Sequence, residues 1–474
     1  MNRQIVQMFG LVVLLFSVLV VFTSRWTVFE AESLEDNTAN RRPLIEELRE
    51  PRGLIFARDG RTVLARSLPR GRGQDRIFTR TYPEGPLFGH AVGYAFVQEG
   101  KAGLEASRND ELTGKEDEFE SIISELQSET EEGADVVTTL DPEAQRLATD
   151  LLGGQNGSVV ALEPDTGRVR VMASVPQFDP NEVPRGGDIQ FFNRATQSSY
   201  PPGSTFKVVT AAAALDTGKY TPESVIDGSS PKEISGVPLS NSGGQSFGPL
   251  PLTDALTNSV NTVFAEVGEK IGRQTLVDYM ERFGFNQDPQ LDYPDGQMKA
   301  SGVREGAGGD LLGGDDGFDA GRVAIGQGGA EGAILVTPLQ MAQVAGAVAN
   351  EGVLTKPRLT ERVVGKDGRV KERIDPDEQN RVMKEETAAE LTAMMARVVD
   401  EGTGTAAALS GIEVAGKTGT AEVDNATSNQ AWFIGFAPVD DPKMAVAVTV
   451  ERTQGQGGTV AAPIAAEVLQ QLLG

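Results

Sequence analysis

The chain has 474 residues, of which 39% are hydrophobic, and this is long enough for two or three domains with a sizeable buried core. Its formal net charge of -25 argues against non-specific nucleic-acid binding, which requires a basic surface. It has no cysteine and one histidine, His90, which excludes a cysteine nucleophile and a multi-histidine metal site. We therefore expect no metal and no cofactor, and we predict that His90 is a structural or surface residue in a turn-like segment.

Residues 5–23 form a predicted transmembrane helix. The run from Ile5 to Phe22 is almost wholly apolar, and at about 1.5 Å per residue it nearly matches the hydrocarbon core of a bilayer. No small-x-small cleavage site follows it, so we predict an uncleaved signal anchor rather than a removed signal peptide. Arg25 and Trp26 indicate a membrane interface after the span, and no second apolar run of this kind follows.

Residues 26–155 are predicted to form a small β-rich module. Residues 52–65 are typical of a strand, an Asp-Gly turn and a second strand. Residues 110–135 are rich in Glu and Ser, which predicts a solvated loop or helix face. A strand is expected at residues 136–140, and Asp141-Pro142 then predicts a helix that begins with an Asp cap and a proline.

Residues 156–474 are predicted to form an α+β domain. The expected order is strands at 158–162 and 168–173, helices over about 204–405, strands at 413–423, 431–437 and 443–450, and a helix at 460–473. Because strands lie at both ends of this region and helices lie between them, we expect an antiparallel sheet with an inserted helical subdomain.

A candidate nucleophile lies in the segment Tyr200-Pro-Pro-Gly-Ser-Thr-Phe-Lys207. The prolines favour a helix start, so Ser204 would lie in a first turn, where free backbone N–H groups favour negative charge. Lys207 would share its face, and burial in the apolar helix would lower the lysine pKa enough for it to act as a base. Alone this pattern is weak, because a helix-capping serine gives the same spacing. A second copy at residues 229–232 contains a proline and predicts a loop.

Two later segments change this balance. Ser259 and Asn261 offer a hydroxyl that can relay a proton and a carboxamide that can hold a peptide, although a simple helix cap has the same pattern. The strand-like segment Gly416-Lys-Thr-Gly-Thr420 offers a cation and two hydroxyls suited to a carboxylate, and its glycines permit close approach of a ligand backbone. An exposed edge strand is the alternative interpretation of this second segment.

The order Ser-x-x-Lys, Ser-x-Asn, Lys-Thr-Gly is a signature of penicillin-binding proteins and β-lactamases. With its other segments, the chain resembles the class B penicillin-binding proteins over nearly its whole length. The further segments that carry this resemblance are Arg52-Gly53, Arg58-Asp-Gly60, Gly103-Leu-Glu105, Asn193-Arg-Ala195, Ile325-Gly-Gln-Gly328, Thr337-Pro-Leu-Gln-Met-Ala342, Gly402-Thr-Gly-Thr405 and Ala431-Trp-Phe-Ile-Gly435.

The resemblance implies a penicillin-binding/β-lactamase-like fold and a peptidoglycan D,D-transpeptidase. Ser204 would attack the D-alanyl-D-alanine bond of a stem peptide, and β-lactams would acylate the same serine. Lys207 would be the base, Ser259 a proton shuttle, and Asn261 would hold the substrate amide. The oxyanion hole would be the backbone N–H groups of Ser204 and Thr420. The residues that would hold the substrate's terminal carboxylate and its backbone are Lys417, Thr418, Gly419 and Thr420.

The resemblance also implies an organisation and partners. Residues 26–155 would be a non-catalytic pedestal or dimerisation-like module, residues 156–474 the transpeptidase domain, and the catalytic part would lie outside the cytoplasm. Because the module is too short to include a glycosyltransferase, a membrane polymerase of lipid II is the implied partner. The alternatives are a D,D-carboxypeptidase, in which water replaces the acceptor amine, and a non-catalytic scaffold for wall assembly. The presence of Ser204, Lys207 and Lys417 disfavours the scaffold.

Overall fold

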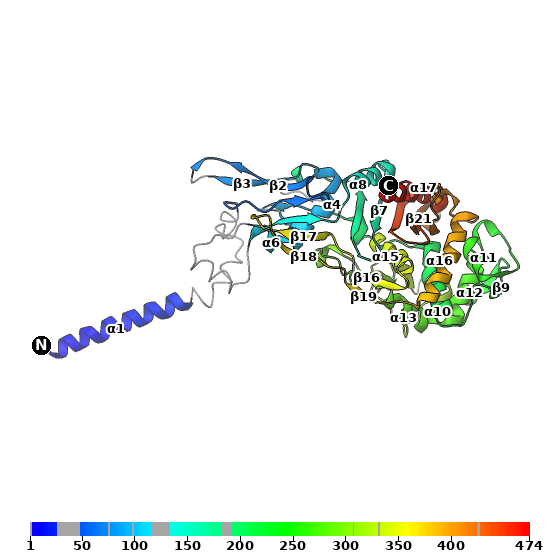
Figure 1. The fold of residues 1–474 in the computed structure, drawn as a ribbon. Coiled ribbons are helices and arrows are strands. Elements are labelled where there is room, and N and C mark those ends of the chain that lie inside the picture. The colour runs from blue at the N-terminus through cyan, green and yellow to red at the C-terminus, as the bar shows by residue number, and fades with distance from the viewer. Residues whose placement is uncertain are drawn as a thin grey trace. The chain divides into compact units, whose positions relative to one another are not determined.

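The computed structural model describes residues 2–25, 48–73, 76–96, 99–114, 133–182, 191–306, 308–329, 332–423 and 427–474. The chain divides into two compact units, one made of Met1–Pro51 with Leu68–Thr79 and the other of Arg52–Ser67 with Arg80–Gly474 (Figure 1). Trp26 and most of the acidic segment at 110–135 lie outside the described residues.

The first helix, α1, runs from Asn2 to Ser24. Residues Arg3–Ser24 have a mean hydropathy of 2.8, and the helix is long and apolar enough to cross a membrane. The structure therefore contains the apolar helix that the sequence predicts at residues 5–23.

An amino-terminal sheet has the strand order β18-β17-β6-β1-β2-β3. Its strands are β1 (Ile55–Phe56), β2 (Val63–Arg70), β3 (Ile77–Thr81), β6 (Asp135–Thr138), β17 (Thr360–Val364) and β18 (Val370–Arg373). β1 and β2 form the predicted hairpin, in which the Asp59 carboxylate accepts hydrogen bonds from the backbone N–H groups of Arg61 and Thr62, both at 2.8 Å. β17 and β18 come from far along the chain, and β17 pairs antiparallel with β6.

Short helices follow this hairpin: α4 (Gly85–Val92), α5 (Leu104–Ser107) and α6 (Asn109–Thr113), with strands β4 (Ala95–Phe96) and β5 (Gly100–Lys101). His90 lies in α4 and is buried, so the expected turn is wrong. Its Nε2 atom lies 3.0 Å from the carbonyl oxygen of Pro176, which confirms a structural role.

A buried ion-pair cluster explains two segments of the family resemblance. Glu105 is fully buried, and its carboxylate accepts hydrogen bonds from Arg52 at 3.0 Å and from Arg80 at 2.5 Å. Removing the carboxylate would leave two buried guanidinium groups without their counter-charge, which is strongly destabilising. The segments that contain Arg52 and Glu105 are thus joined in space.

The carboxy-terminal sheet has the antiparallel order β20-β21-β22-β7-β8, so strands from both ends of the domain form it, as predicted. Its strands are β7 (Gly157–Leu162), β8 (Val169–Val175), β20 (Ala415–Val423), β21 (Ser428–Ala437) and β22 (Met444–Thr453). Helices α8 (Pro142–Leu152) and α17 (Gly457–Leu473) pack on one face, and α15 (Pro338–Ala349) packs on the other. In β22, Val446 and Val448 belong to the core that also contains residues of α8 and α17, and Ala445 and Ala447 belong to the core that contains residues of α15, because successive side chains alternate between the two faces of the sheet. Burial on both faces explains the continuous apolar runs of these strands.

Helices between these strands form the predicted helical subdomain, which lies at one end of the domain (Figure 1). They are α10 (Lys207–Asp216), α11 (Leu252–Thr257), α12 (Asn261–Ile271), α13 (Arg273–Arg282), α14 (Ala320–Ala324) and α16 (Glu385–Asp400). The same region contains three short strand pairs: β9 (Val225–Asp227) with β12 (Pro249–Pro251), β10 (Lys232–Ile234) with β11 (Val237–Leu239), and β16 (Val353–Thr355) with β19 (Glu378–Arg381). It also contains a three-stranded sheet of β13 (Gly302–Arg304), β15 (Gly332–Leu335) and β14 (Gly328–Gly329).

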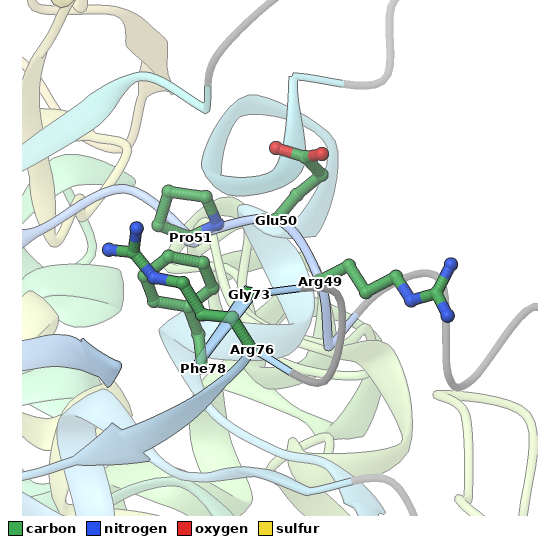
Figure 2. A pocket seen from close by; sticks show the side chains of 6 residues that line it. All are labelled: Arg49, Glu50, Pro51, Gly73, Arg76 and Phe78. Carbon is green, nitrogen blue, oxygen red and sulfur yellow. The ribbon is translucent and has the colours of Figure 1, made fainter. Parts of the chain in front are cut away.

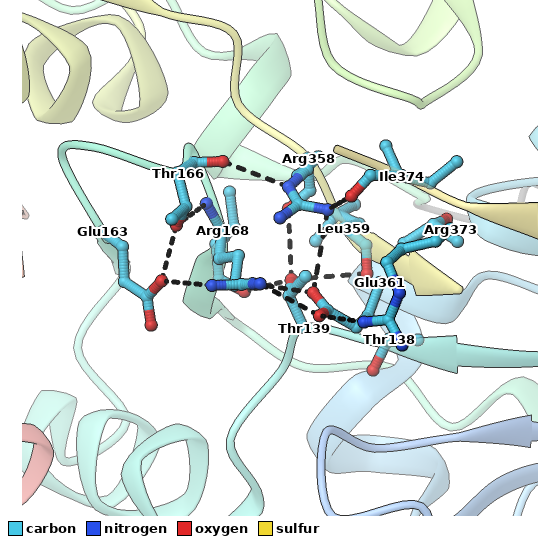
Figure 3. Close-up of polar contacts among 12 residues, drawn as sticks. Thr138, Thr139, Glu163, Thr166, Arg168, Arg358, Leu359, Glu361, Arg373 and Ile374 are labelled. Carbon is cyan, nitrogen blue, oxygen red and sulfur yellow. Dashed lines mark hydrogen bonds and ion pairs between the residues drawn. The ribbon is translucent and has the colours of Figure 1, made fainter. Parts of the chain in front are cut away.

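A polar cluster links the ends of β6, β8 and β17 (Figure 3). Arg168 donates hydrogen bonds to Glu361 at 2.7 and 3.0 Å and to Glu163 at 3.2 Å. The hydroxyl of Thr139 donates to the carbonyl oxygen of Val169 at 2.6 Å. The amino-terminal sheet is therefore tied to the carboxy-terminal sheet by charge as well as by packing.

Candidate active site

Ser204 lies in a short 3₁₀ turn, Gly203–Phe206, that leads directly into α10. The predicted helix start is correct, but the serine is one turn ahead of the α-helix. Gly203 has a φ of 54°, and its N–H donates to the carbonyl oxygen of Gly326 at 3.0 Å. A Cβ on Gly326 would lie 1.8 Å from the carbonyl oxygen of Gly203, so only glycine permits this approach. Contacts between backbones thus fix the turn that carries Ser204.

Lys207 is fully buried at the start of α10. Its Nζ atom donates hydrogen bonds to the carbonyl oxygen of Ser259 at 2.7 Å, to Asn261 Oδ1 at 2.8 Å and to Ser259 Oγ at 3.3 Å. The structure therefore brings Lys207 together with two other predicted site residues, Ser259 and Asn261, which lie more than 50 residues later in the chain. Within the described part of the chain, Ser204 Oγ makes no hydrogen bond of its own.

Ser259 lies between α11 and α12 with a φ of 57°, a left-handed conformation that is uncommon for a residue other than glycine. The N–H of Val260 donates to Ala255 O at 2.8 Å and the N–H of Ser259 donates to Leu256 O at 3.1 Å, so the end of α11 imposes this conformation. Strain of this kind is typical of functional positions. It directs Ser259 Oγ between two lysines, since Lys417 Nζ lies 2.9 Å from it.

The two lysines occupy the same buried, positively charged site. Burial lowers the pKa of Lys207 well below its ordinary value, and the nearby charge of Lys417 lowers it further. Burial also lowers the pKa of Lys417 to about 7. Neither lysine forms an ion pair with any described residue. A neutral lysine is therefore accessible near neutral pH, and a neutral amine is what a general base requires.

The predicted carboxylate-binding segment forms β20, an edge strand that packs against the Ser204 turn. A Cβ on Gly419 would lie 2.7 Å from the carbonyl oxygen of Pro202, and one on Gly203 would lie 2.9 Å from that of Thr420. The glycines thus allow β20 and the Ser204 turn to approach each other, besides allowing the close approach of a ligand that the sequence predicts. The Thr420 hydroxyl accepts a hydrogen bond from the N–H of Gly457 at 3.1 Å, which leaves its proton available to a carboxylate.

Thr403 is a site residue that the sequence does not single out as functional. Its hydroxyl lies 2.6 Å from the hydroxyl of Thr418, and its N–H donates to Thr257 O at 3.3 Å. Thr403 therefore orients one of the two hydroxyls predicted for the carboxylate. The Gly-Thr-Gly-Thr segment that contains it supports the family resemblance, but its spacing does not indicate proximity to β20.

Glu451, which the sequence does not single out, and Trp432 support the segment before Ser204. Glu451 accepts a hydrogen bond from the Tyr200 hydroxyl and another from Arg194 at 2.7 Å. Trp432 donates from its indole nitrogen to the carbonyl oxygen of Pro201 at 3.0 Å and packs edge-on against Tyr200. Burial and the Glu451 carboxylate both raise the pKa of Tyr200, so this hydroxyl stays a donor.

The second Ser-x-x-Lys copy, residues 229–232, lies in a loop that ends at β10, as predicted. Lys232 pairs there with Glu266 on α12, and this segment contributes nothing to the cluster around Lys207. Within the described ranges, no group of three or more carboxylates or histidines is placed to hold a metal ion.

Comparison with known proteins identifies the family. A model of the penicillin-binding protein transpeptidase domain matches residues 157–470, and a model of the penicillin-binding protein A dimerisation domain matches residues 52–136. The chain belongs to the class B penicillin-binding proteins.

Individual relatives agree with this family. Peptidoglycan D,D-transpeptidase PbpA of Mycolicibacterium smegmatis is 34% identical over 92% of both chains, and PbpA of Mycobacterium tuberculosis is 32% identical over 100% of this chain and 99% of the relative. Among solved structures, penicillin-binding protein A of M. tuberculosis as a ceftriaxone acyl-enzyme complex has a TM-score of 0.78 at 29% identity and covers 91% of this chain and 100% of that one. A D,D-transpeptidase domain from Eggerthella lenta has a TM-score of 0.76 at 32% identity, covering 90% and 99% of the two chains. This class B penicillin-binding protein thus matches these relatives over 90% or more of its length.

Proposed function

We propose that this chain is a peptidoglycan D,D-transpeptidase whose nucleophile is Ser204 and whose base is Lys207. The observation that carries the proposal is the buried lysine that meets Ser259 and Asn261 one helical turn from Ser204. A lysine with a lowered pKa can accept a proton without histidine.

The proposed reaction uses these groups in turn. Ser204 Oγ attacks the carbonyl carbon of the D-alanyl-D-alanine bond and loses its proton to Lys207. The carbon–nitrogen bond breaks, and Ser259, which lies between the two lysines, donates its proton to the departing D-alanine and is reprotonated by Lys207. The amine of a neighbouring stem peptide then attacks the acyl ester and loses a proton to Lys207, and the ester carbon–oxygen bond breaks as this proton returns to Ser204 Oγ, which leaves the cross-link and the free serine.

The remaining groups hold the substrate. Lys417, Thr418 and Thr420 bind its terminal carboxylate, and Asn261 binds its amide. Ser204 lies at the start of a helical turn, where backbone N–H groups have no partner within the turn. Its N–H and that of Thr420 form the oxyanion hole, supported by the close approach of β20 to this turn.

Penicillin labelling tests the nucleophile. The intact mass of the full chain should increase by one drug molecule, and Ser204→Ala should abolish the increase. Ser229→Ala, in the second Ser-x-x-Lys copy, is the matched control and should be labelled like the wild type. An adduct that survives in Ser204→Ala would refute the assignment.

An assay with a donor stem peptide, in the presence and absence of an acceptor amine, distinguishes a D,D-transpeptidase from a D,D-carboxypeptidase. A transpeptidase yields the cross-linked product when the amine is present. A D,D-carboxypeptidase yields only the hydrolysed donor in both cases, and that outcome would replace the proposed reaction.

We further propose that residues 26–155 form a non-catalytic module and residues 156–474 the transpeptidase domain. Helix α1 would anchor both of them to the membrane, on the side outside the cytoplasm. The hydropathy of α1 and the two matched family models support this organisation. A membrane glycosyltransferase that polymerises lipid II is the proposed partner, since neither family model supplies that activity. Co-purification from mild detergent tests it, and recovery of this chain without a membrane polymerase would contradict it.

A further inference from the structure

The hairpin of β2 and β3 differs in charge from the rest of the chain. Residues 48–80 contain nine arginines and three acidic residues, whereas the whole chain has a net charge of -25. The arginines are Arg49, Arg52, Arg58, Arg61, Arg66, Arg70, Arg72, Arg76 and Arg80, and the acidic residues are Glu50, Asp59 and Asp75. Basic charge concentrated in so acidic a protein points to an anionic binding partner.

Four of these arginines, Arg49, Arg70, Arg72 and Arg76, form what we call the basic tip. All four side chains are exposed, and none of them forms an ion pair with another described residue. Arg52, Arg58 and Arg80, in contrast, are paired with Glu105 or Asp141. Leu68 lies beside the tip and is 40% exposed. The tip therefore combines exposed positive charge with an exposed apolar side chain.

The geometry of the tip suits a surface rather than a single small anion. Arg49, Arg76 and Phe78 line an open hollow of about 630 Å³ (Figure 2). The guanidinium of Arg76 lies 4.9 Å from the Phe78 ring centre, whereas the Arg49 side chain points away from it. Two guanidinium groups that diverge cannot close on one phosphate, but they can meet separate phosphates on an extended anionic surface.

The chain itself keeps the basic tip close to one such surface. Residues 25–47 separate α1 from the tip, and at about 3.4 Å per residue they reach no further than about 80 Å. A tether of this length holds the tip at a high local concentration next to any bilayer that contains α1.

We propose that the basic tip binds the anionic phospholipid headgroups of the membrane that holds α1, with Leu68 entering the interfacial layer. Clusters of basic residues next to a membrane span bind anionic bilayers in this way. The proposal rests on the anchoring by α1 proposed above, and it is independent of the chemistry at Ser204.

The absence of cysteine allows a direct test on the full chain. Leu68→Cys, labelled with a polarity-sensitive fluorophore, is placed in nanodiscs of either phosphatidylcholine or a phosphatidylcholine–phosphatidylglycerol mixture. We expect a blue shift and quenching by spin-labelled lipid in the anionic discs only. Both signals should disappear at about 1 M salt, because the screening length falls there to about 3 Å.

Charge reversal provides the matched comparison. Arg70→Glu/Arg72→Glu in the labelled chain should lower the membrane-bound population of the probe about tenfold or more. Arg61→Glu/Arg369→Glu changes the net charge equally at two other exposed positions and should leave the signal intact. Penicillin labelling of each variant verifies its fold, and incorporation into the disc verifies α1. Three outcomes would overturn the proposal: equal fluorescence signals in both disc types, an unchanged signal in the Arg70→Glu/Arg72→Glu variant, or a signal that requires an added protein instead of anionic lipid.

Discussion

At the scale of single residues, the site depends on two lysines that share one hydroxyl. Ser259 Oγ lies 3.3 Å from Lys207 Nζ and 2.9 Å from Lys417 Nζ, and both lysines are fully buried. Two adjacent buried cations are costly, so the pair favours a state with a single positive charge. Burial and the nearby charge of Lys417 both lower the pKa of Lys207, so Lys207 is the one expected to be neutral.

This arrangement predicts a bell-shaped pH dependence for the second-order rate constant of penicillin acylation, which reports the free enzyme. At acid pH the rate falls because Lys207 becomes protonated and cannot accept a proton. Above about pH 7 it falls because Lys417 loses the charge that attracts the carboxylate. Lys417→Arg, which keeps its charge, should remove the alkaline limb and retain the acid limb. Stopped-flow acylation across pH measures this, and a profile without an alkaline limb in the wild type would contradict it.

A second prediction concerns Glu451. We expect this residue to position the proposed nucleophile, Ser204, without contacting the substrate. Glu451→Gln removes the charge that holds Tyr200 and Arg194, so the turn before Ser204 should loosen. Because small displacements of a nucleophile are costly, we expect acylation to slow about ten- to hundredfold with little change in the melting temperature. Glu467→Gln, exposed on α17, is the control. If both variants acylate at the wild-type rate, Glu451 has no positioning role.

At the scale of elements, the decisive contact is that between β20 and the Ser204 turn. A Cβ on Gly419 would lie 2.7 Å from Pro202 O and 2.9 Å from a methyl group of Thr205, so strand or turn must shift. The strand cannot move freely, since β20 pairs along its length with β21. The proposed oxyanion hole and the proposed nucleophile, Ser204, should therefore be sensitive to the size of one side chain.

Gly419→Ala should consequently slow acylation by tenfold or more, on the order of the cost of a misplaced reactive group. Gly296→Ala is the matched control, because nothing lies within 4 Å of its added Cβ. Acylation kinetics, with circular dichroism to verify folding, measure the effect. Wild-type kinetics in Gly419→Ala would show that the turn adapts.

The elements themselves were largely predictable from local patterns. Apolar runs predicted β7, β8, β20, β21 and β22, and Asp141 with its proline predicted α8, where the Asp141 carboxylate accepts from Ala144 N at 3.0 Å. The proximity of Lys207, Ser259 and Lys417 followed only from the motif order of a known family, since spacing carries no distance information. Thr403 and Glu451 were not predicted because their contacts depend on how β20 and β22 pack, which no local pattern encodes.

At the scale of the whole molecule, the amino-terminal sheet is not continuous in sequence. β17 and β18 come from within residues 156–474, yet β17 pairs with β6, and Val363 of β17 is buried. Arg168 and Glu361 add an ion pair next to this joint. The range proposed for the transpeptidase domain therefore includes a strand, β17, whose partner β6 lies outside it, and β18 joins the same sheet through β17.

Residues 156–474 produced alone should accordingly be poorly soluble, because β17 would present an unpaired edge. Residues 48–474 should be soluble and should form the penicillin adduct. Soluble yield and adduct formation of the two fragments measure the difference. A soluble, monomeric and penicillin-reactive fragment 156–474 would show that the sheet is dispensable for the catalytic fold.

The interrupted sheet also constrains how genes for such proteins can exchange parts. A single crossover near residue 156 would join β1 and β6 from one parent to β17 and β18 from another. Strand partners that have diverged in sequence, β6 and β17, would then meet within one sheet. We expect viable mosaic genes to exchange the segments around residues 52–140 and 358–373 together, or to exchange neither.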